Sequence, residues 1–274
     1  MKFKIFNLKF LKMSLIFGAI VPHPPLLIPA IGRDNLKEME KTGRSFKELE
    51  EILYAKKPDT IIVISPHGNL MTEAFTINHS PVLKADFEDF GDLETKLEFK
   101  NDNALAYQIR ESLETKLPLV LTTVERLDHG VSVPLYYLTR HLPDFRIIPV
   151  GYSMLSFAEH FAFGAAIRRV LNLTNKRVAV IASGDLSHRL TLEAPAGFSE
   201  RGREFDAKLI ELLKQKDLKS ILKLNSDLVK EAGECGLKSI LILLGVLDEI
   251  NYQPEILSYE APFGVGYLVA NFSF

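Results

Sequence analysis

The feature of this 274-residue sequence that most restricts its fold is the alternation of short apolar runs with amphipathic helical segments. Runs rich in β-branched residues, such as TIIVIS at residues 60–65 and RVAVIAS at 177–183, are typical of strands buried on both faces of a parallel sheet. Between the runs, apolar residues recur every three or four positions, as in residues 34–57 and 104–116. The pattern predicts an α/β fold in which a single domain has a mostly parallel central sheet flanked by helices.

The N-terminal region has a pattern similar to that of a signal peptide, because lysines precede an apolar run there. We interpret residues 14–22 as the first core strand and residues 1–13 as a candidate N-terminal extension, with Met13 as an alternative start. Residues 14–274 then form one domain, without an internal repeat or an obvious linker. No apolar stretch approaches the roughly 18 uncharged residues that a membrane span requires, so no membrane association is expected.

Charge and cysteine content exclude several classes of protein. The net charge is −2 and the lysines and arginines are scattered, which argues against a nucleic-acid-binding surface. The one cysteine, Cys235, cannot form an internal disulfide or a cluster of several thiolates. This cysteine content is consistent with a cytoplasmic protein.

Histidines follow the ends of the predicted strands. His23, His67 and His188 come one to six residues after apolar runs, and His129 lies between the run LVLTTV and a helical segment. In open α/β sheets, ligands bind in the crevice outside the carboxyl ends of the strands. We therefore expect the four imidazoles to converge at that edge of the sheet.

Several histidines at one edge predict a metal site, because neutral imidazole is the commonest metal ligand in proteins. Glu234, in the stretch KEAGECG before an apolar helix, is the candidate anionic ligand, and a solvated capping glutamate is the alternative interpretation. Asp185 is a candidate acceptor that fixes the tautomer of a histidine ring, or else a turn residue. We interpret Cys235 as a small buried thiol.

Five short motifs occur in order along the chain: VPHPP, SPHG, DHG, SGDLSH and GECG. Together they resemble the class III extradiol ring-cleavage dioxygenases, the LigB-like superfamily of the protocatechuate 4,5-dioxygenase β subunit. The closing stretch YEAPFGVGYLVA is similar to the branch of that superfamily associated with AMMECR1-type domains, and MEMO-like proteins are more distant relatives. The resemblance spans nearly the whole chain from Leu15 and implies that residues 14–274 are a LigB-like catalytic domain of the extradiol dioxygenase type.

The resemblance also implies roles for individual residues. His23, His67 and Glu234 match metal ligands, His188 matches the catalytic histidine, and His129 matches a second active-site histidine. The expected cofactor is non-haem Fe(II), with Zn(II) as the alternative, and the expected substrates are a catechol-like aromatic compound and O2. A homo-oligomer and an AMMECR1-type partner domain are expected on the same grounds.

Three functions stay open at this point. The first is an Fe(II)-dependent extradiol-type dioxygenase. The second is a zinc-dependent hydrolase that uses the same ligands to activate water. The third is a non-catalytic MEMO-like binding module.

Overall fold

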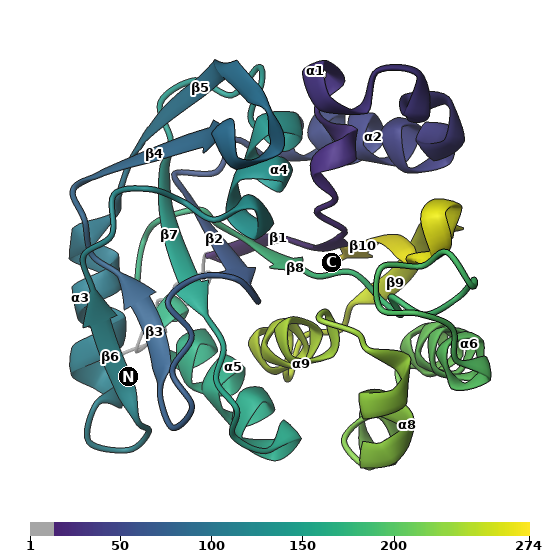
Figure 1. Ribbon diagram of the computed structural model, residues 1–274. Coiled ribbons are helices and arrows are strands. Elements are labelled where there is room, and N and C mark those ends of the chain that lie inside the picture. The colour runs from purple at the N-terminus through teal and green to yellow at the C-terminus, as the bar shows by residue number, and fades with distance from the viewer. Residues whose placement is uncertain (1–13) are drawn as a thin grey trace, which may run out of the picture.

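The computed structural model describes residues 14–274 and contains a central eight-stranded sheet (Figure 1). The predicted extension, residues 1–13, lies outside the described residues. The strand order is β6-β3-β7-β2-β8-β1-β10-β9. The strands of this sheet are β1 (Leu15–Val21), β2 (Thr60–Ser65), β3 (Phe75–Asn78), β6 (Leu119–Thr122), β7 (Arg146–Gly151), β8 (Val178–Ser183), β9 (Gln253–Glu260) and β10 (Tyr267–Ser273).

The four central strands, β7, β2, β8 and β1, all run parallel. Their hydrogen-bonded register keeps the carboxyl ends level, because Val21 pairs with Ser183 and Ile64 pairs with Ala182. On one side β10 and β9 are added in antiparallel fashion, and on the other side β3 runs antiparallel to β7 with β6 parallel to β3. The predicted mostly parallel sheet in an α/β domain is confirmed.

Helices cover both faces of the sheet (Figure 1). Alternating side chains of β2 divide the core, since Ile61 and Val63 pack on one face and Ile62 and Ile64 on the other. The first face is covered by α2 (Glu40–Lys56) and α4 (His129–Leu138). The second is covered by α3 (Asn103–Leu113), α5 (Phe157–Leu171), α6 (Glu200–Gln215), α8 (Ser226–Ala232) and α9 (Leu237–Val246). Two short helices, α1 (Pro29–Gly32) and α7 (Leu218–Ile221), complete the α-helices of the described residues.

A separate hairpin, β4 (Val82–Phe87) and β5 (Asp92–Lys100), stands beside the sheet and packs through β4 against α4. Its strands are joined by a short 3-10 turn at Glu88–Phe90. The sequence pattern indicated only an acidic, partly extended excursion here, because the apolar residues that fasten it, such as Leu83 and Phe87, are separated by charged ones. Within residues 14–274, no helix is long and apolar enough to cross a membrane.

Candidate metal centre

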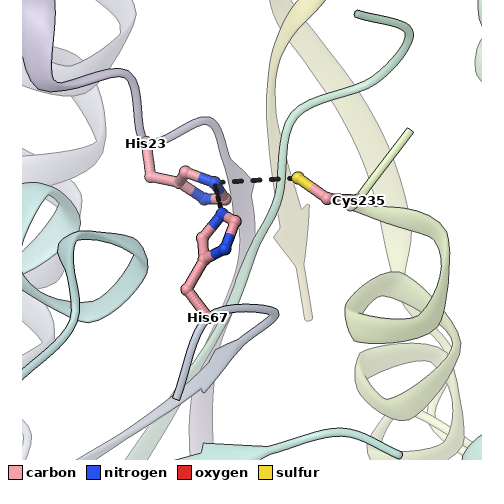
Figure 2. Close-up of side chains that lie close together, drawn as sticks. All are labelled: His23, His67 and Cys235. Atoms are coloured by element: carbon pink, nitrogen blue, oxygen red, sulfur yellow. Dashed lines mark hydrogen bonds between the residues drawn. The ribbon is translucent and has the colours of Figure 1, made fainter. Parts of the chain in front are cut away.

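Three neighbouring strands each place a polar residue two positions beyond their carboxyl ends. His23 follows β1, His67 follows β2, and Asp185 follows β8, which lies between them. The parallel strands end level with one another, so these residues meet at one edge of the sheet. The Nε2 atoms of His23 and His67 lie 2.9 Å apart (Figure 2). The other ring nitrogen of His23, Nδ1, is hydrogen-bonded to Ser183 Oγ at 2.9 Å, and this contact orients the ring.

Cys235 is the third member of this group. Its Sγ lies 3.7 Å from His23 Nε2, and the donor atoms of Cys235, His23 and His67 all lie within 4.8 Å of one another (Figure 2). The interpretation of Cys235 as a buried thiol therefore missed its position beside the two candidate metal-ligating histidines. A thiolate and two imidazoles are a donor set that proteins use for zinc and other transition metals.

Glu234, immediately before Cys235, makes a capping contact. Its Oε2 accepts a hydrogen bond from the Leu237 N–H at 2.6 Å, at the start of α9. Burial raises the pKa of this carboxyl group to about 7. The structure shows the contact expected of a capping glutamate, and the role of Glu234 as a metal ligand stays a prediction.

A close approach of two glycines brings the Cys235 segment to the sheet edge. A Cβ atom on Gly184, just beyond β8, would overlap the Cα of Gly236. Only glycine permits this backbone contact. Next to it, the N–H of Asp185 donates to Cys235 Sγ at 3.3 Å and the N–H of Cys235 donates to the Asp185 carbonyl at 3.2 Å.

Asp185 lies between two of the predicted histidines. Its Oδ1 accepts a hydrogen bond from the backbone N–H of His23 at 2.9 Å. Its Oδ2 lies 4.0 Å from His23 Nε2 and 3.8 Å from His188 Nε2. Burial raises the pKa of Asp185 to about 7. The carboxyl group is thus inside the cluster, at distances longer than direct hydrogen bonds to either ring nitrogen.

His188 is held by a main-chain carbonyl group. Its Nδ1 lies 2.7 Å from the Gly233 carbonyl oxygen, an acceptor that requires the proton on Nδ1. The Nε2 lone pair of the neutral ring therefore faces the Asp185 side of the cluster. Burial lowers the pKa of His188, which favours this neutral form.

His129 reaches the cluster by a different route from the one the sequence suggested. Its preceding strand, β6, runs in the opposite direction to the central strands, so its carboxyl end does not lie at their carboxyl edge. Residues 123–128 carry the chain back, and Asp128 anchors it by accepting hydrogen bonds from Ser65 Oγ at 2.5 Å and the Val131 N–H at 3.2 Å. The His129 ring then stacks on His67 with centroids 4.2 Å apart.

The electrostatics of the cluster suit a cation. Burial is the main cause that lowers the pKa of all four imidazoles, to about 4 for His67. The rings are therefore neutral near pH 7 and offer lone pairs. Burial also leaves Asp185 and Glu234 with raised pKa values, and a bound divalent ion would stabilise their ionised forms. The residues present thus fit a metal ion.

A cleft of about 510 Å³ opens beside the cluster. His67 and His129 form part of its wall, and the Phe90 ring meets His129 edge to face with centroids 5.3 Å apart. The remainder is lined by polar groups of β3 and the loop after β6, by charged residues of the hairpin, and by apolar residues such as Leu127 and Val150. The sequence pattern contained no signal for the hairpin wall, because it comes from outside the sheet.

Similar proteins support the identification of the fold and the family. A protein of Clostridium acetobutylicum, CA_C1420, is 34% identical over 265 residues, and the match covers 93% of this chain and 57% of that protein. The chain therefore spans little more than half the length of that relative. A MEMO1 family protein of Methanococcoides burtonii is 23% identical, with 90% of this chain and 85% of that protein covered.

Two further comparisons extend this result. A 2,3-dihydroxyphenylpropionate/2,3-dihydroxicinnamic acid 1,2-dioxygenase of Azotobacter vinelandii is 27% identical over 184 residues, covering 64% of this chain and 57% of the enzyme. The crystal structure of an uncharacterized Escherichia coli K12 protein, JW3007, has the same fold, with a TM-score of 0.69, 18% identity and coverage of 94% of this chain and 100% of that one. Residues 18–270 match the family model described as the catalytic LigB subunit of aromatic ring-opening dioxygenase, and the chain belongs to this family.

Proposed function

We propose that this protein is a non-haem Fe(II)-dependent, extradiol-type dioxygenase that cleaves a catechol-like ring. The observation that carries the proposal is the pair of imidazoles, from His23 and His67, whose Nε2 atoms face each other at 2.9 Å beside a cleft large enough for an aromatic substrate. Family membership and a relative named as a dioxygenase support it.

The proposed ligands are His23, His67 and the carboxylate of Glu234. Two neutral imidazoles and one carboxylate form the face that non-haem Fe(II) oxygenases use, with open positions for substrate. Bound Fe(II) would supply the site at which a catechol and O2 come together and exchange electrons. Because Glu234 caps α9 through Oε2, its other carboxylate oxygen is the atom proposed to bind the metal.

His188 is the proposed proton carrier. Its Nδ1–H is engaged by the Gly233 carbonyl, so Nε2 is the atom that accepts a proton from a substrate hydroxyl and returns it later. His129 is proposed to hydrogen-bond the substrate or oxygen, because its ring lies in the cleft wall against His67. Asp185, with Oδ2 3.8 Å from His188 Nε2, is proposed to stabilise the protonated ring between the two transfers.

Oxygen uptake by the Fe(II)-loaded protein with a panel of catechols tests the proposal. The expected result is catechol-dependent consumption of O2 with the absorbance of a ring-cleaved product. Iron bound at one ion per chain, with no oxygen uptake on any catechol and no product, would contradict it.

The position of Cys235 favours a second candidate. A thiolate is a softer ligand than a carboxylate and suits Zn(II), which with the two histidines would leave one position for water and support hydrolysis. The third candidate is a non-catalytic MEMO-like binding module, which is consistent with the similarity to a MEMO1 family protein. Glu234→Gln and Cys235→Ser separate these assignments, because the proposed dioxygenase loses Fe(II) affinity mainly in Glu234→Gln and the zinc site loses Zn(II) affinity mainly in Cys235→Ser.

Assembly is part of the same proposal. A homo-oligomer and an AMMECR1-type partner domain stay predictions, as does a cytoplasmic location. Sedimentation of the purified chain measures the first of these directly, and a single monomeric species would contradict it.

A further inference from the structure

The outer wall of the cleft carries three charged side chains that the proposed reaction does not use. Asp86 and Asp89 come from the β4–β5 hairpin, and Arg126 from the segment that precedes α4. Arg126 is the one cationic side chain, Lys or Arg, among the described residues that line the cleft. The two carboxylates outnumber the guanidinium group, so this wall has a net negative charge. Asp128, which also lines the cleft, adds to that charge whenever it is ionised.

The Arg126 guanidinium group is already engaged by both hairpin carboxylates. Its Nε lies 3.0 Å from Asp86 Oδ2 and its Nη2 lies 2.7 Å from Asp86 Oδ1, a two-point contact. The same Nη2 lies 2.9 Å from Asp89 Oδ2. A substrate carboxylate that approached Arg126 would have to displace one of these partners while facing the other.

The two carboxylates differ in accessibility. The Asp86 side chain is only 17% exposed, whereas that of Asp89 is 70% exposed. Asp89 also precedes Phe90, whose ring forms an edge-to-face contact with His129. Asp89 is paired with Arg126 through Oδ2 but stays largely exposed. A cation entering the cleft therefore meets an accessible carboxylate next to an aromatic ring, and both attract positive charge.

We propose that this cleft selects catechols by the charge of their side chain, favouring an aminoalkyl group, accepting a neutral alkyl group and disfavouring a carboxylate, with Asp89 as the residue that receives the ammonium. This selectivity rests on the proposed function for the identity of the ring. It concerns the hairpin wall of the cleft, which meets the cluster through the Phe90–His129 contact, and the charge preference itself is measurable without turnover.

Binding of three matched catechols tests the selectivity. The probes are 3,4-dihydroxyphenethylamine, 4-ethylcatechol and 3-(3,4-dihydroxyphenyl)propionate, which share the ring and differ mainly in side-chain charge. Their dissociation constants are measured anaerobically by titration calorimetry on the full Fe(II)-loaded chain, and oxygen uptake is then recorded for each. The amine is expected to bind about tenfold or more tightly than the carboxylate, with the neutral probe between them. The ratio should shrink in high salt.

Variants of the hairpin locate the effect. Asp89→Asn removes the accessible carboxylate and should reduce the amine-to-carboxylate affinity ratio by at least about threefold. Glu94→Gln is the matched control, because it removes the same charge from an exposed position on β5 that does not line the cleft. The double variant Asp86→Asn/Asp89→Asn releases Arg126, and it should reverse the order so that the carboxylate binds most tightly. Circular dichroism checks that each variant folds.

Several outcomes would overturn the selectivity: a carboxylate probe that binds as tightly as the amine, equal changes in Asp89→Asn and Glu94→Gln, or no binding of any probe. The two proposals fail separately. The expected binding order without oxygen uptake would support the charge selectivity and contradict the dioxygenase. Oxygen uptake that is fastest with the carboxylate probe would support the dioxygenase and overturn the selectivity.

Discussion

The two ends of the central strands each bury an aspartate, and the two environments differ. At the amino end, Asp102 accepts hydrogen bonds from Lys176 Nζ at 2.6 Å and Thr60 Oγ1 at 2.5 Å. Burial alone would raise the pKa of Asp102, but these hydrogen bonds hold it below its ordinary value. At the carboxyl end, Asp185 faces neutral imidazoles, and burial raises its pKa to about 7.

The difference between the two environments indicates that the two aspartates have different roles. The charge of a buried carboxylate that has its own ammonium partner is already paired, and removing that partner destabilises the fold. A buried carboxyl group among neutral imidazole rings lacks a charged partner, and a bound cation would stabilise its ionised form. Removing the partner of Asp102 should therefore alter stability, and changes to the side chains around Asp185 should alter chemistry.

The largest expected effect is on turnover, from His188→Ala. Loss of the proposed proton carrier should lower kcat by about 100- to 10,000-fold. Iron content and the urea midpoint should stay close to those of the parent, because His188 is not a proposed ligand. Single-turnover oxygen uptake on the iron-loaded variant measures this, and an unchanged rate would remove His188 from the proposed mechanism.

At the opposite end, Lys176→Met should destabilise the fold without changing metal binding. It leaves Asp102 buried without its cation, and such losses cost about 3–5 kcal/mol when both partners are fully buried. Because the Lys176 side chain is 36% exposed, we expect about 2 kcal/mol after allowance for solvent screening. Urea unfolding measures the change, and a variant as stable as the parent would remove the contrast between the two ends.

The glycine contact behind Cys235 provides a more local test. Gly184→Ala forces a Cβ into the Gly236 backbone and should destabilise the protein by about 1–3 kcal/mol, with weaker metal binding as the Cys235 segment shifts. Gly43→Ala, within α2, meets no atom within 4 Å and should instead stabilise by up to about 1 kcal/mol. Thermal unfolding of the pair gives the comparison, and a Gly184→Ala protein at least as stable as the parent would show that the contact is not tight.

The smallest expected effect is the acid dependence that Asp102 contributes. Its folded-state pKa is depressed relative to the unfolded value near 4, so its stabilisation is present above that pH and is lost as the pH falls through the folded pKa. The stability difference between the parent and Lys176→Met should therefore shrink by about 1 kcal/mol between pH 6 and pH 3. A difference that stays constant over this range in urea titrations would exclude the linkage.

The sequence predicted the sheet and the meeting of four histidines because both follow from local rules. Buried β-branched runs predict parallel strands, and residues such as His23 and His67, placed just after those strands, must emerge at their carboxyl edge. His129 also lies at the cluster, although its strand runs the opposite way and the loop anchored by Asp128 supplies the real reason.

Other parts of the site depend on contacts between distant segments. Cys235 joins the histidines because Gly184 and Gly236, which are far apart in sequence, touch through their backbones. The charged wall of the cleft depends on Arg126 meeting Asp86, 40 residues earlier, and neither residue stands in a motif. The sequence favours Glu234 over the adjacent Cys235 as a ligand, but it carries no information on the direction of either side chain, which is set by the entry into α9.

Metal analysis under anaerobic conditions tests the central claim most directly. Fe(II) bound per chain is measured by mass spectrometry for the parent, for His23→Ala and for His141→Ala, a matched control whose exposed ring pairs with Glu50 away from the cluster. One ion per chain is expected in the parent and in His141→Ala, with an Fe(II) affinity reduced by more than about a hundredfold in His23→Ala. Equal iron content in all three proteins, or no iron in the parent, would contradict it.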